Sequence, residues 1–419
     1  MVRNRVHTEL IAGLDIGSSV VRLAVGQLSS SKDSTPRLQI IGAVEVASEG
    51  IQKGQIISIE DTVSAVSHAL EQTEKLVGVP ISDVWVGVSG TQIISQESKG
   101  VVAVSRTDGE IADEDIERAV EAAKAVAAPL NYEILHVLPR TFAVDGQTGI
   151  KDPVGMTGIR LEVDTKIIHC VSSHIKNLSK VVYRAGVDID DCVLLILAAG
   201  EVVAGSRQRE LGCVVINIGG PTTSMVVYED GDVLHTAVIP IGSSHITNDL
   251  ALGLRTSIDI AERVKVEHGE CVSKGISKKD VIDLQDFGAD KSEIVSRYYI
   301  AQIIEARVSE ILEKVDLELS RIDRSGMLPA GAICIGGGSK IRGMVDCTKE
   351  VLSLPAQLGY SMGMDSISDK INDIAFSPAI GLVKWGSTLS HVGKRKFVRS
   401  NVVGKVAEKV KGIFKSLIP

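Results

Sequence analysis

The feature that most constrains the fold is a short pattern that occurs twice. Residues 14–25 read LDIGSSVVRLAV and residues 216–227 read INIGGPTTSMVV. Each copy has an Asp or Asn, then Ile, then Gly between two runs of strand-forming residues. Two such hairpins far apart in the chain predict two related lobes, each of which brings a turn to one shared cleft. The alternative is a chance similarity, because Ile-Gly turns are common.

The second turn has part of the chemistry of a phosphate loop. The stretch NIGGPTTS, residues 217–224, contains a Gly-Gly pair and three hydroxyl side chains. Glycine lets backbone N–H groups approach an anion closely. The stretch contains no acid and no base, so it is a phosphate site, a disabled phosphate site or an ordinary hairpin.

The size of the chain predicts more than one domain. Its 419 residues exceed the roughly 250 to 300 at which a single core stops growing. Only 3% are aromatic, so the cores must be built from Val, Ile, Leu and Ala. The six cysteines form no CxxC pair and have no His at metal-ligand spacing. This pattern favours reduced thiols in a cytoplasmic protein and argues against a zinc site.

Charge is unevenly distributed along the chain. The formal net charge of −8 argues against nucleic-acid binding. Residues 394–419 nevertheless contain eight Lys or Arg and a single acid, Glu408. The N-terminus lacks the apolar run of a signal peptide, and no apolar stretch approaches the ~20 residues that span a bilayer. A basic tail on an acidic body therefore needs its own explanation.

Strand-like and helix-like segments alternate, which predicts an α/β fold with sheets covered by helices. Residues 58–78 show apolar spacing of three and four and end at Gly78, as a helix does. Residues 112–127, ADEDIERAVEAAKAVA, predict a helix whose acidic first turn suits the helix dipole.

Several motifs in a fixed order resemble one known family. They are GLDIGSS (13–19), SEGIQKGQI (48–56), ADEDIERAV (112–120), residues 134–164, RELGCVVINIGGPTTS (209–224), residues 239–265, EARVSEILEKV (305–315) and AGAICIGGGSKIRGM (330–344). Together they resemble the FtsA family of bacterial cell-division proteins, within the actin-like ATPase superfamily. Each motif alone is weak, but the order and spacing cover nearly the whole chain.

The resemblance implies an actin-like, RNase H-like fold of two lobes with four subdomains and a nucleotide between the lobes. It places the first core, subdomain 1A, at 1–83 and 165–198, with the inserted subdomain 1C at 84–164. The second core, 2A, is expected at 199–228 and 305–387, and the small subdomain 2B at 229–304. A linker at 388–401 and a C-terminal amphipathic helix at 402–419 complete this division.

In the first turn, the resemblance assigns nucleotide contacts to Gly17, Ser18 and Ser19, which offer hydroxyls and N–H groups to phosphates. Asp15 is expected to hold Mg²⁺ through water, because a hard cation prefers oxygen ligands. Many relatives have a lysine where this chain has Val20. Arg22 lies two residues further along the strand, on the same face, and could take the place of that lysine. Alternatively, Asp15 only caps its own turn.

In the second turn, the family usually reads DIGGGTTD, and this chain departs from it at Asn217, Pro221 and Ser224. Asn217 and Ser224 replace carboxylates, and Pro221 lacks an N–H donor. The sequence keeps the remaining members of the cradle, Gly219, Gly220, Thr222 and Thr223. We therefore expect ATP to bind while hydrolysis is slow or absent; the competing hypothesis is an empty or purely structural cleft. No residue that positions a water was identified.

The resemblance also predicts adenosine contacts in the second lobe. Glu262 and Lys265 are expected near the ribose and adenine, and their spacing puts them on one helix face. The same spacing is typical of a solvated ion pair. A glycine run lets the backbone pass close to the adenosine, although such a run also makes plain turns. The predicted residues there are Gly336, Gly337, Gly338 and Ile341.

The C-terminal tail has the pattern of a helix that lies in an anionic membrane surface. One face is expected to insert Val403, Val406, Val410, Ile413, Phe414 and Leu417. Lysines are expected at the lipid headgroups, at Lys405, Lys409 and Lys415. One such helix binds weakly, so polymerisation would add avidity. The alternative is a terminal helix packed on the protein body.

The resemblance finally implies a partner site for the acidic C-terminal peptide of the tubulin-like protein FtsZ. Arg297 and Arg307 could pair with its carboxylates, although such arginines are more often in surface salt bridges. The leading function is an adaptor that self-polymerises, tethers FtsZ filaments to the cytoplasmic face of the membrane at the division site and recruits other division proteins. The alternatives are a pilus-assembly-type adaptor and a superfamily phosphotransferase.

Overall fold

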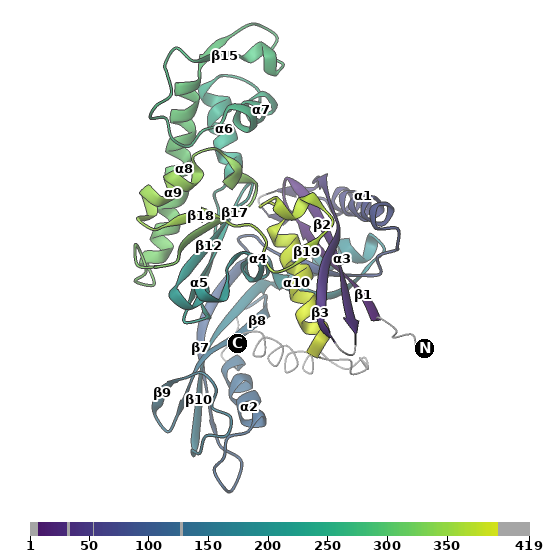
Figure 1. Ribbon diagram of the computed structural model, residues 1–419, viewed down its shortest axis with the longest axis vertical. Helices are drawn as coiled ribbons and strands as arrows, with labels where there is room; N and C mark the ends of the chain where they lie inside the picture. Colours follow the sequence, from purple (N-terminus) through teal and green to yellow (C-terminus); the bar gives the residue numbers. More distant parts are fainter. Residues whose placement is uncertain (1–6, 32–33, 53, 126–128, 393–419) are drawn as a thin grey trace.

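The computed structural model describes residues 7–31, 34–52, 54–125 and 129–392. The predicted membrane helix and most of its linker therefore lie outside the described residues. Within them, two mixed sheets form two lobes, and a third sheet forms a separate subdomain at the lower end of the molecule (Figure 1). The predicted α/β, actin-like class is confirmed by this architecture.

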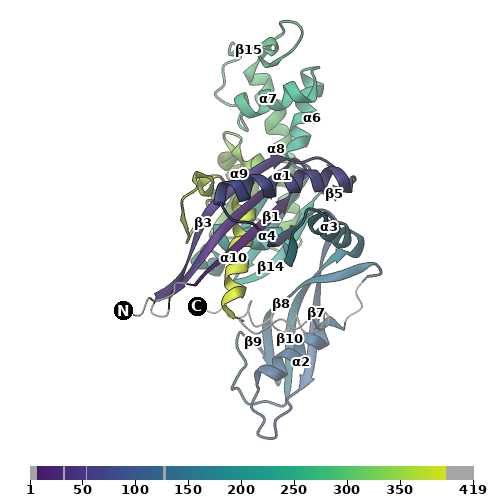
Figure 2. The same ribbon diagram turned by 90° about the vertical axis from the view of Figure 1, so that its right-hand side faces the viewer.

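The first sheet has the strand order β11-β6-β1-β2-β3-β19. Its strands are β1 (His7–Ile16), β2 (Val20–Ser31), β3 (Ser34–Ala47), β6 (Asp83–Val88), β11 (Asp188–Leu194) and β19 (Asp365–Ser366). The first three are antiparallel, whereas β6 is parallel to β1 and β11 is parallel to β6. Helices α1 (Ile59–Val77) and α3 (Ser172–Arg184) pack together on one side of this sheet (Figure 2). As predicted, α1 ends at Gly78, which has φ of 75°.

The second sheet repeats the plan of the first, with order β14-β13-β12-β17-β18. Its strands are β12 (Cys213–Ile218), β13 (Thr223–Glu229), β14 (Asp232–Ile239), β17 (Gly331–Ile335) and β18 (Ala356–Leu358). Again three antiparallel strands are followed by parallel ones. Helices α8 (Arg297–Ser320) and α9 (Met344–Leu352) pack on its outer side. The predicted relationship between the two lobes is therefore present in strand order and direction.

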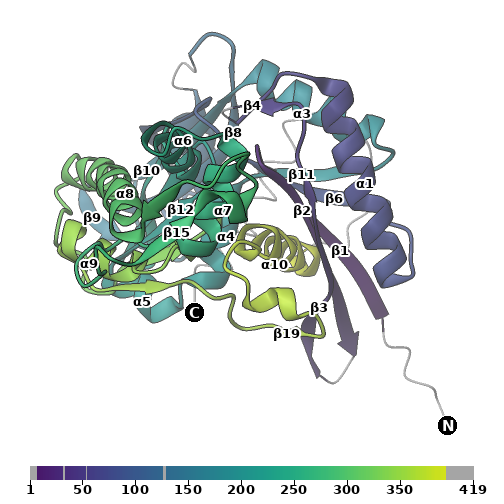
Figure 3. The ribbon, with the colours of Figure 1, turned by 90° about the horizontal axis from the view of Figure 1, so that it is seen from above.

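Two helices lie between the two sheets and join the lobes (Figure 3). They are α4 (Leu195–Val203) and α10 (Ser377–Val392). A Cβ added at Gly381 of α10 would lie 2.2 Å from the Ala198 carbonyl oxygen of α4, and one added at Gly13 of β1 would lie 2.4 Å from the Ala379 oxygen. Glycine is therefore required for this close packing. The buried core around these helices contains residues of both sheets.

The inserted subdomain has its own sheet and core. The sheet order is β7-β10-β8-β9, and helix α2 (Asp113–Lys124) covers one face. Its strands are β7 (Ile93–Ala103), β8 (Tyr132–Val144), β9 (Gln147–Ile150) and β10 (Arg160–Val171). Buried Lys166 of β10 donates a hydrogen bond of 2.6 Å to the Leu234 carbonyl oxygen of β14. The insert is thus anchored to the second lobe as well as to the first.

The upper end of the molecule in Figure 1 is a helical subdomain attached to the second lobe. It contains α6 (Ser243–Gly253), α7 (Ile258–His268), the first part of α8, the 3₁₀ turn η1 (Leu284–Phe287) and the strands β15 (Val281–Asp283) and β16 (Ile294–Ser296). The remaining elements are β4 (Ile51–Gln52), β5 (Gln55–Ile56), α5 (Ser206–Leu211), η2 (Gly337–Lys340) and η3 (Asp369–Asn372).

The structure moves several predicted boundaries. Because β6 pairs with β1, the insert begins after Val88 and not at 84, and β10 extends to Val171, beyond 164. β14 belongs to the second sheet, so subdomain 2B does not begin at 229. α8 crosses 304 without a break.

The predicted end of the second core needs the same correction. That core was expected to include residues up to 387, but the chain returns to the first lobe before then. β19 pairs with β3, and α10 packs on β1 and β2.

Two further sequence predictions concern cysteines and membrane spans. All six cysteines lie within the described residues, and none of them forms a disulfide there. In the described ranges, no helix combines the length and apolar character that crossing a membrane requires.

Candidate nucleotide site

The first predicted turn joins β1 to β2. The Gly17 N–H donates to the Val20 carbonyl oxygen at 3.2 Å and closes the hairpin. Asp15 lies directly opposite Arg22, and Arg22 lies directly opposite Glu45 on β3. Directly opposed residues point to the same face of a sheet, so these three charged side chains form one row.

Asp15 is buried, with 6% of its surface exposed. Burial raises the pKa of its carboxyl to about 6, against the opposing effect of the Arg22 charge. A cation or a water network brought by a ligand would stabilise the ionised form of this buried carboxylate. This burial gives more weight to the functional interpretation of Asp15 than to the turn cap.

Arg22 is held by neighbours of the first lobe. Its Nε lies 3.3 Å from Glu45 Oε2, and its guanidinium carbon lies 5.5 Å from the centre of the Phe376 ring. Sequence reasoning missed both partners, since nothing in their local pattern links them to Arg22. Ser18 is also engaged, because its Oγ accepts a 2.9 Å hydrogen bond from the Gly54 N–H.

The second turn repeats the geometry of the first. The Gly219 N–H donates to the Thr222 carbonyl oxygen at 2.9 Å, as Gly17 does to Val20. Asn217 lies directly opposite Ser224, in the places that Asp15 and Arg22 occupy in the first lobe. The pair of charged residues in one lobe therefore corresponds to a neutral pair in the other.

The two turns touch. A Cβ built on Gly220 would lie 2.6 Å from the Ser19 Oγ of the opposite lobe, which is too close for two atoms that are not bonded. The prediction that the turns of the two lobes face each other is therefore confirmed.

The glycine run after β17 lies against the second turn. Gly336 has φ of 88°, and a Cβ there would lie 2.3 Å from Asn217 Oδ1. At Gly338, a Cβ would lie 2.5 Å from Ile218 Cγ2, whereas no atom of the described residues lies within 4 Å of one at Gly337. Gly336 and Gly338 thus let the glycine run pack closely against the second turn, which a side chain at either position would prevent. The half-buried Ile341 ends η2.

Glu262 and Lys265 lie on α7 and form a contact pair of 2.7 Å between Glu262 Oε2 and Lys265 Nζ. Only 8% of the Lys265 side chain is exposed, so this is not a solvated surface pair. Thr247 of α6 contacts both: its Oγ1 donates to Glu262 Oε2 at 2.6 Å and accepts from Lys265 Nζ at 2.8 Å. Sequence reasoning missed Thr247.

Helix α6 also contacts the second turn. The N–H groups of Ser243 and Ser244 donate to the carbonyl oxygens of Gly219 and Gly220, both at 2.9 Å. A Cβ at Gly242 would lie 2.4 Å from the Gly220 oxygen. The predicted phosphate turn and the predicted adenosine pair are therefore two ends of one connected structure.

The predicted partner arginines are both in ion pairs. Arg307 of α8 donates from Nη2 to Asp249 Oδ1 at 2.9 Å, and its Nε and Nη1 contact Asp249 and Glu310. These carboxylates raise the pKa of the guanidinium, led by Asp249. Arg297 donates from Nη1 to Asp280 Oδ2 at 2.8 Å. Both arginines are partly buried, and they lie at different places on α8.

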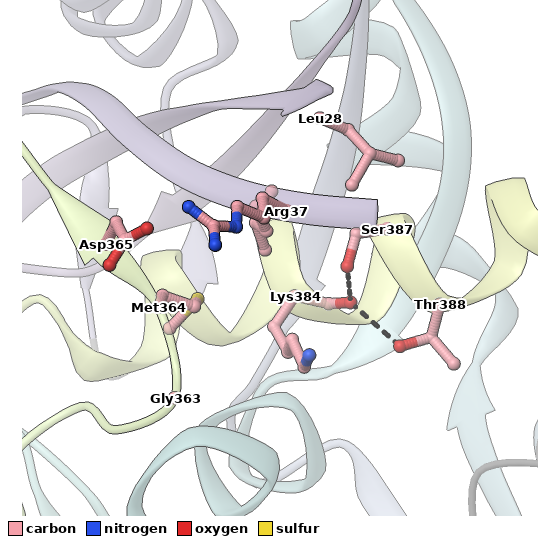
Figure 4. Close-up of a pocket in the computed structure, with 9 residues that line it drawn as sticks. Leu28, Arg37, Gly363, Met364, Asp365, Lys384, Ser387 and Thr388 are labelled. Carbon is pink, nitrogen blue, oxygen red and sulfur yellow. Dashed lines mark hydrogen bonds between the residues drawn. The ribbon is translucent and has the colours of Figure 1, made fainter. Parts of the chain in front are cut away.

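A cavity of about 790 Å³ lies elsewhere, between the far ends of β2, β3 and α10 (Figure 4). None of the predicted site residues within the described ranges lines it. Its lining is Leu28, Arg37, Leu38, Gly363, Met364, Asp365, Lys384, Ser387 and Thr388. Ser387 Oγ donates to the Lys384 carbonyl oxygen at 2.7 Å, so this hydroxyl is already used within α10.

Metal ligands are sparse in the described part of the chain. No group of three or more His, Cys, Asp or Glu side chains there is arranged to hold a metal ion. At the two turns, Asp15 is the carboxylate that the sequence predicted, and a single carboxylate suits Mg²⁺, which keeps several of its waters. The predicted membrane residues lie outside the described residues, so the structure says nothing of them.

The architecture is similar to known actin-like structures. A PilM-PilN type IV pilus biogenesis complex matches with a TM-score of 0.64 and 16% identity, covering 90% of this chain and 98% of that one. MreB5 of Spiroplasma citri bound to ADP matches with a TM-score of 0.52 and 13% identity, covering 92% and 99%. These identities show a shared fold.

Sequence relatives are much closer. Cell division protein FtsA of Borreliella burgdorferi is 35% identical over 97% of this chain and 98% of its own length. The FtsA of Bacillus subtilis is 35% identical over 93% and 86%, and that of Pseudomonas aeruginosa is 33% identical over 90% and 89%. Family models match too, as "Cell division protein FtsA" at residues 214–381 and "SHS2 domain inserted in FTSA" at residues 90–169. The chain belongs to the FtsA family of cell-division proteins and has its actin-like nucleotide-binding fold.

Proposed function

We propose that this chain binds ATP between its two lobes and hydrolyses it slowly or not at all. The contact between Ser19 and Gly220 carries the proposal, because it brings two hairpins of the same design face to face. Their backbone N–H groups and hydroxyls lie on both sides of the place where phosphates would enter. Nucleotide complexes of a protein with the same fold support this choice of ligand.

Mg²⁺ would be held by the phosphates and, through water, by Asp15, and it would neutralise phosphate charge. Across the site, Asn217 and Ser224 offer no second carboxylate. A neutral amide activates water poorly, and loss of acid or base help costs about 10² to 10⁴ in rate. This difference argues against the phosphotransferase alternative.

The test measures ATP affinity and phosphate release on the same purified protein with Mg²⁺. Tight binding with phosphate release far below that of ordinary actin-like ATPases supports the proposal. Rapid turnover contradicts slow hydrolysis, and absence of binding contradicts the site itself.

We also propose that the chain tethers FtsZ filaments to the cytoplasmic face of the membrane at the division site. The support is the basic amphipathic pattern of residues 402–419 and membership of the FtsA family. Because one such helix binds weakly, self-association into filaments would supply avidity. Other division proteins would then be recruited to the same surface.

Liposome cosedimentation tests this tether. The full chain should sediment with vesicles containing anionic lipid, and a chain ending at Leu389 should not. Phe414→Asp should weaken binding strongly, whereas the matched Ser416→Asp adds the same charge outside the predicted apolar set and should weaken it less. Equal sedimentation of the full and shortened chains would rule the tether out.

We further propose that the FtsZ peptide binds near Arg307. Asp249 and Glu310 already hold the guanidinium in a fixed direction, and about a quarter of its side chain is exposed. A carboxylate of the acidic peptide would compete with Asp249 for the same N–H groups. Arg297, which Asp280 holds, is the second candidate contact.

A further inference from the structure

A polar cluster connects α6 and α7 behind the predicted adenosine site. It consists of Thr247, Glu262, Lys265 and the carbonyl group of Ser243. Lys265 Nζ lies 2.7 Å from Glu262 Oε2, 2.8 Å from Thr247 Oγ1 and 3.4 Å from the Ser243 oxygen. These three acceptors match the three hydrogens of an ammonium group.

Burial separates the members of this cluster into two kinds. Thr247 is 3% exposed and Lys265 is 7% exposed. The Glu262 side chain, in contrast, is 49% exposed. A buried ammonium group with all its hydrogens in use is costly to move, because any hydrogen bond it gives up leaves a buried donor unsatisfied. Lys265 is therefore a fixed support for its neighbours in this cluster.

Glu262 is the member that can face a ligand. Its Oε2 accepts from both Thr247 Oγ1 and Lys265 Nζ. Among the described residues, no donor contacts its other oxygen, Oε1. The carboxylate is thus held by one oxygen and presents the other to the surface. A carboxylate oxygen in this position suits a hydroxyl donor such as that of a ribose.

Thr247 is the residue that joins this carboxylate to the phosphate turn. It lies one helical turn after Ser243, whose N–H donates to the Gly219 oxygen. We propose that Thr247 is a positioning residue for nucleotide recognition: it fixes Glu262 and Lys265 relative to the turn at 217–224, so that Glu262 selects a ligand with free ribose hydroxyls. This inference rests on the proposed binding of ATP.

The test compares ATP with 2′,3′-dideoxy-ATP, which lacks both ribose hydroxyls. The readout is the ratio of the two Kd values, measured by calorimetry on the full chain with Mg²⁺. For the wild type we expect dideoxy-ATP to bind at least about tenfold more weakly, the scale of a hydrogen bond to a charged group. In Thr247→Val the ratio should fall below about threefold, mainly because ATP binds more weakly.

A matched set of variants separates positioning from folding. Thr247→Ser keeps the hydroxyl and should keep a ratio within about twofold of the wild type. Thr256→Val makes the same chemical change at a half-buried position outside the cluster and should leave the ratio unchanged. Glu262→Gln, at a half-exposed side chain, should lower the ratio as Thr247→Val does. The double variant should lower it no further.

The outcomes distinguish this inference from the function on which it rests. Loss of affinity for both nucleotides by the same factor in Thr247→Val means a merely structural role and overturns the inference. A wild-type ratio near one also overturns it, while leaving ATP binding intact. If the wild type binds neither nucleotide, the proposed function itself fails.

Discussion

Ser19 and Gly220 are in contact although they belong to different lobes and lie about half the chain apart. The Ser19 Oγ is 2.6 Å from the place that a Cβ on Gly220 would take. Each residue lies at the tip of a hairpin closed by the same hydrogen bond, from Gly17 to Val20 and from Gly219 to Thr222. A ligand bound between the turns, as proposed above, would therefore meet residues of both lobes.

The first prediction concerns that contact. Gly220→Ala places a methyl group against Ser19 Oγ, so the Ser19 hydroxyl must turn away from Gly220 or the turns must shift, and we expect ATP affinity to fall by about tenfold. The double variant with Ser19→Ala removes the opposing oxygen and should recover part of the loss. Gly205→Ala is the control, because its Cβ would have only one neighbour, at 3.6 Å. Additive losses in the double variant would contradict a direct contact.

The second prediction concerns the pH dependence of stability. Burial raises the pKa of Asp15 to about 6 in the folded protein, from an ordinary value of 3.8. The folded state then binds more protons than the unfolded state between these values, so stability falls as pH rises from about 4 to 6. Asp15→Asn should raise the free energy of unfolding by about 2 to 3 kcal/mol at pH 8 and by little at pH 4.

Urea unfolding of the ligand-free protein at several pH values measures this difference. Glu71→Gln, at an exposed position of α1, is the control for loss of one acid. ATP binding with Mg²⁺ should also weaken as pH falls below about 6, because Asp15 is then neutral. A stability difference that is the same at pH 4 and pH 8 would show that Asp15 is not the titrating group.

The third prediction concerns the missing carboxylate. Asn217→Asp restores an acid directly opposite Ser224, and we expect phosphate release to rise by about ten- to a hundredfold, part of the usual scale of acid or base help. Asn248→Asp makes the same change at an exposed position of α6 and should have no effect. Unchanged phosphate release by Asn217→Asp, with ATP still bound, would mean that slow hydrolysis has another cause.

The fourth prediction concerns the partner site. Asp249→Asn weakens the competitor for Arg307, so an acidic FtsZ C-terminal peptide should bind about three- to tenfold more tightly. Arg307→Ala should reduce binding at least about tenfold. Fluorescence anisotropy of the labelled peptide measures both. Arg321→Ala, at an exposed arginine just after the same helix, is the control. If Arg307→Ala binds the peptide as the wild type does, the partner site lies elsewhere.

The sequence was sufficient to predict those parts of the fold that have a local or repeated pattern. The two hairpins could be predicted because Asp15 and Asn217 begin the same pattern, and the end of α1 could be predicted because Gly78 is a helix terminator. Both follow from backbone preferences that depend on neighbouring residues only.

Contacts between distant segments could not be predicted in this way. The return of α10 to the first lobe depends on the close packing of Gly381 against Ala198. Nothing in the sequence around either residue indicates this contact. The ion pair of Arg307 with Asp249 and the role of Thr247 likewise appear only once α6 lies beside α7 and α8. The sequence of one helix does not show which of its polar residues contact a partner on the neighbouring helix.

The most direct test of the central claim is hydrogen–deuterium exchange of the full chain with and without ATP and Mg²⁺. If the two turns close on one ligand, exchange should slow together in peptides that cover residues 15–22 and 217–224. If the slower exchange of both peptides saturates at the same ATP concentration, the result supports a shared site. Slower exchange in one turn alone, or in neither while ATP is bound, would contradict it.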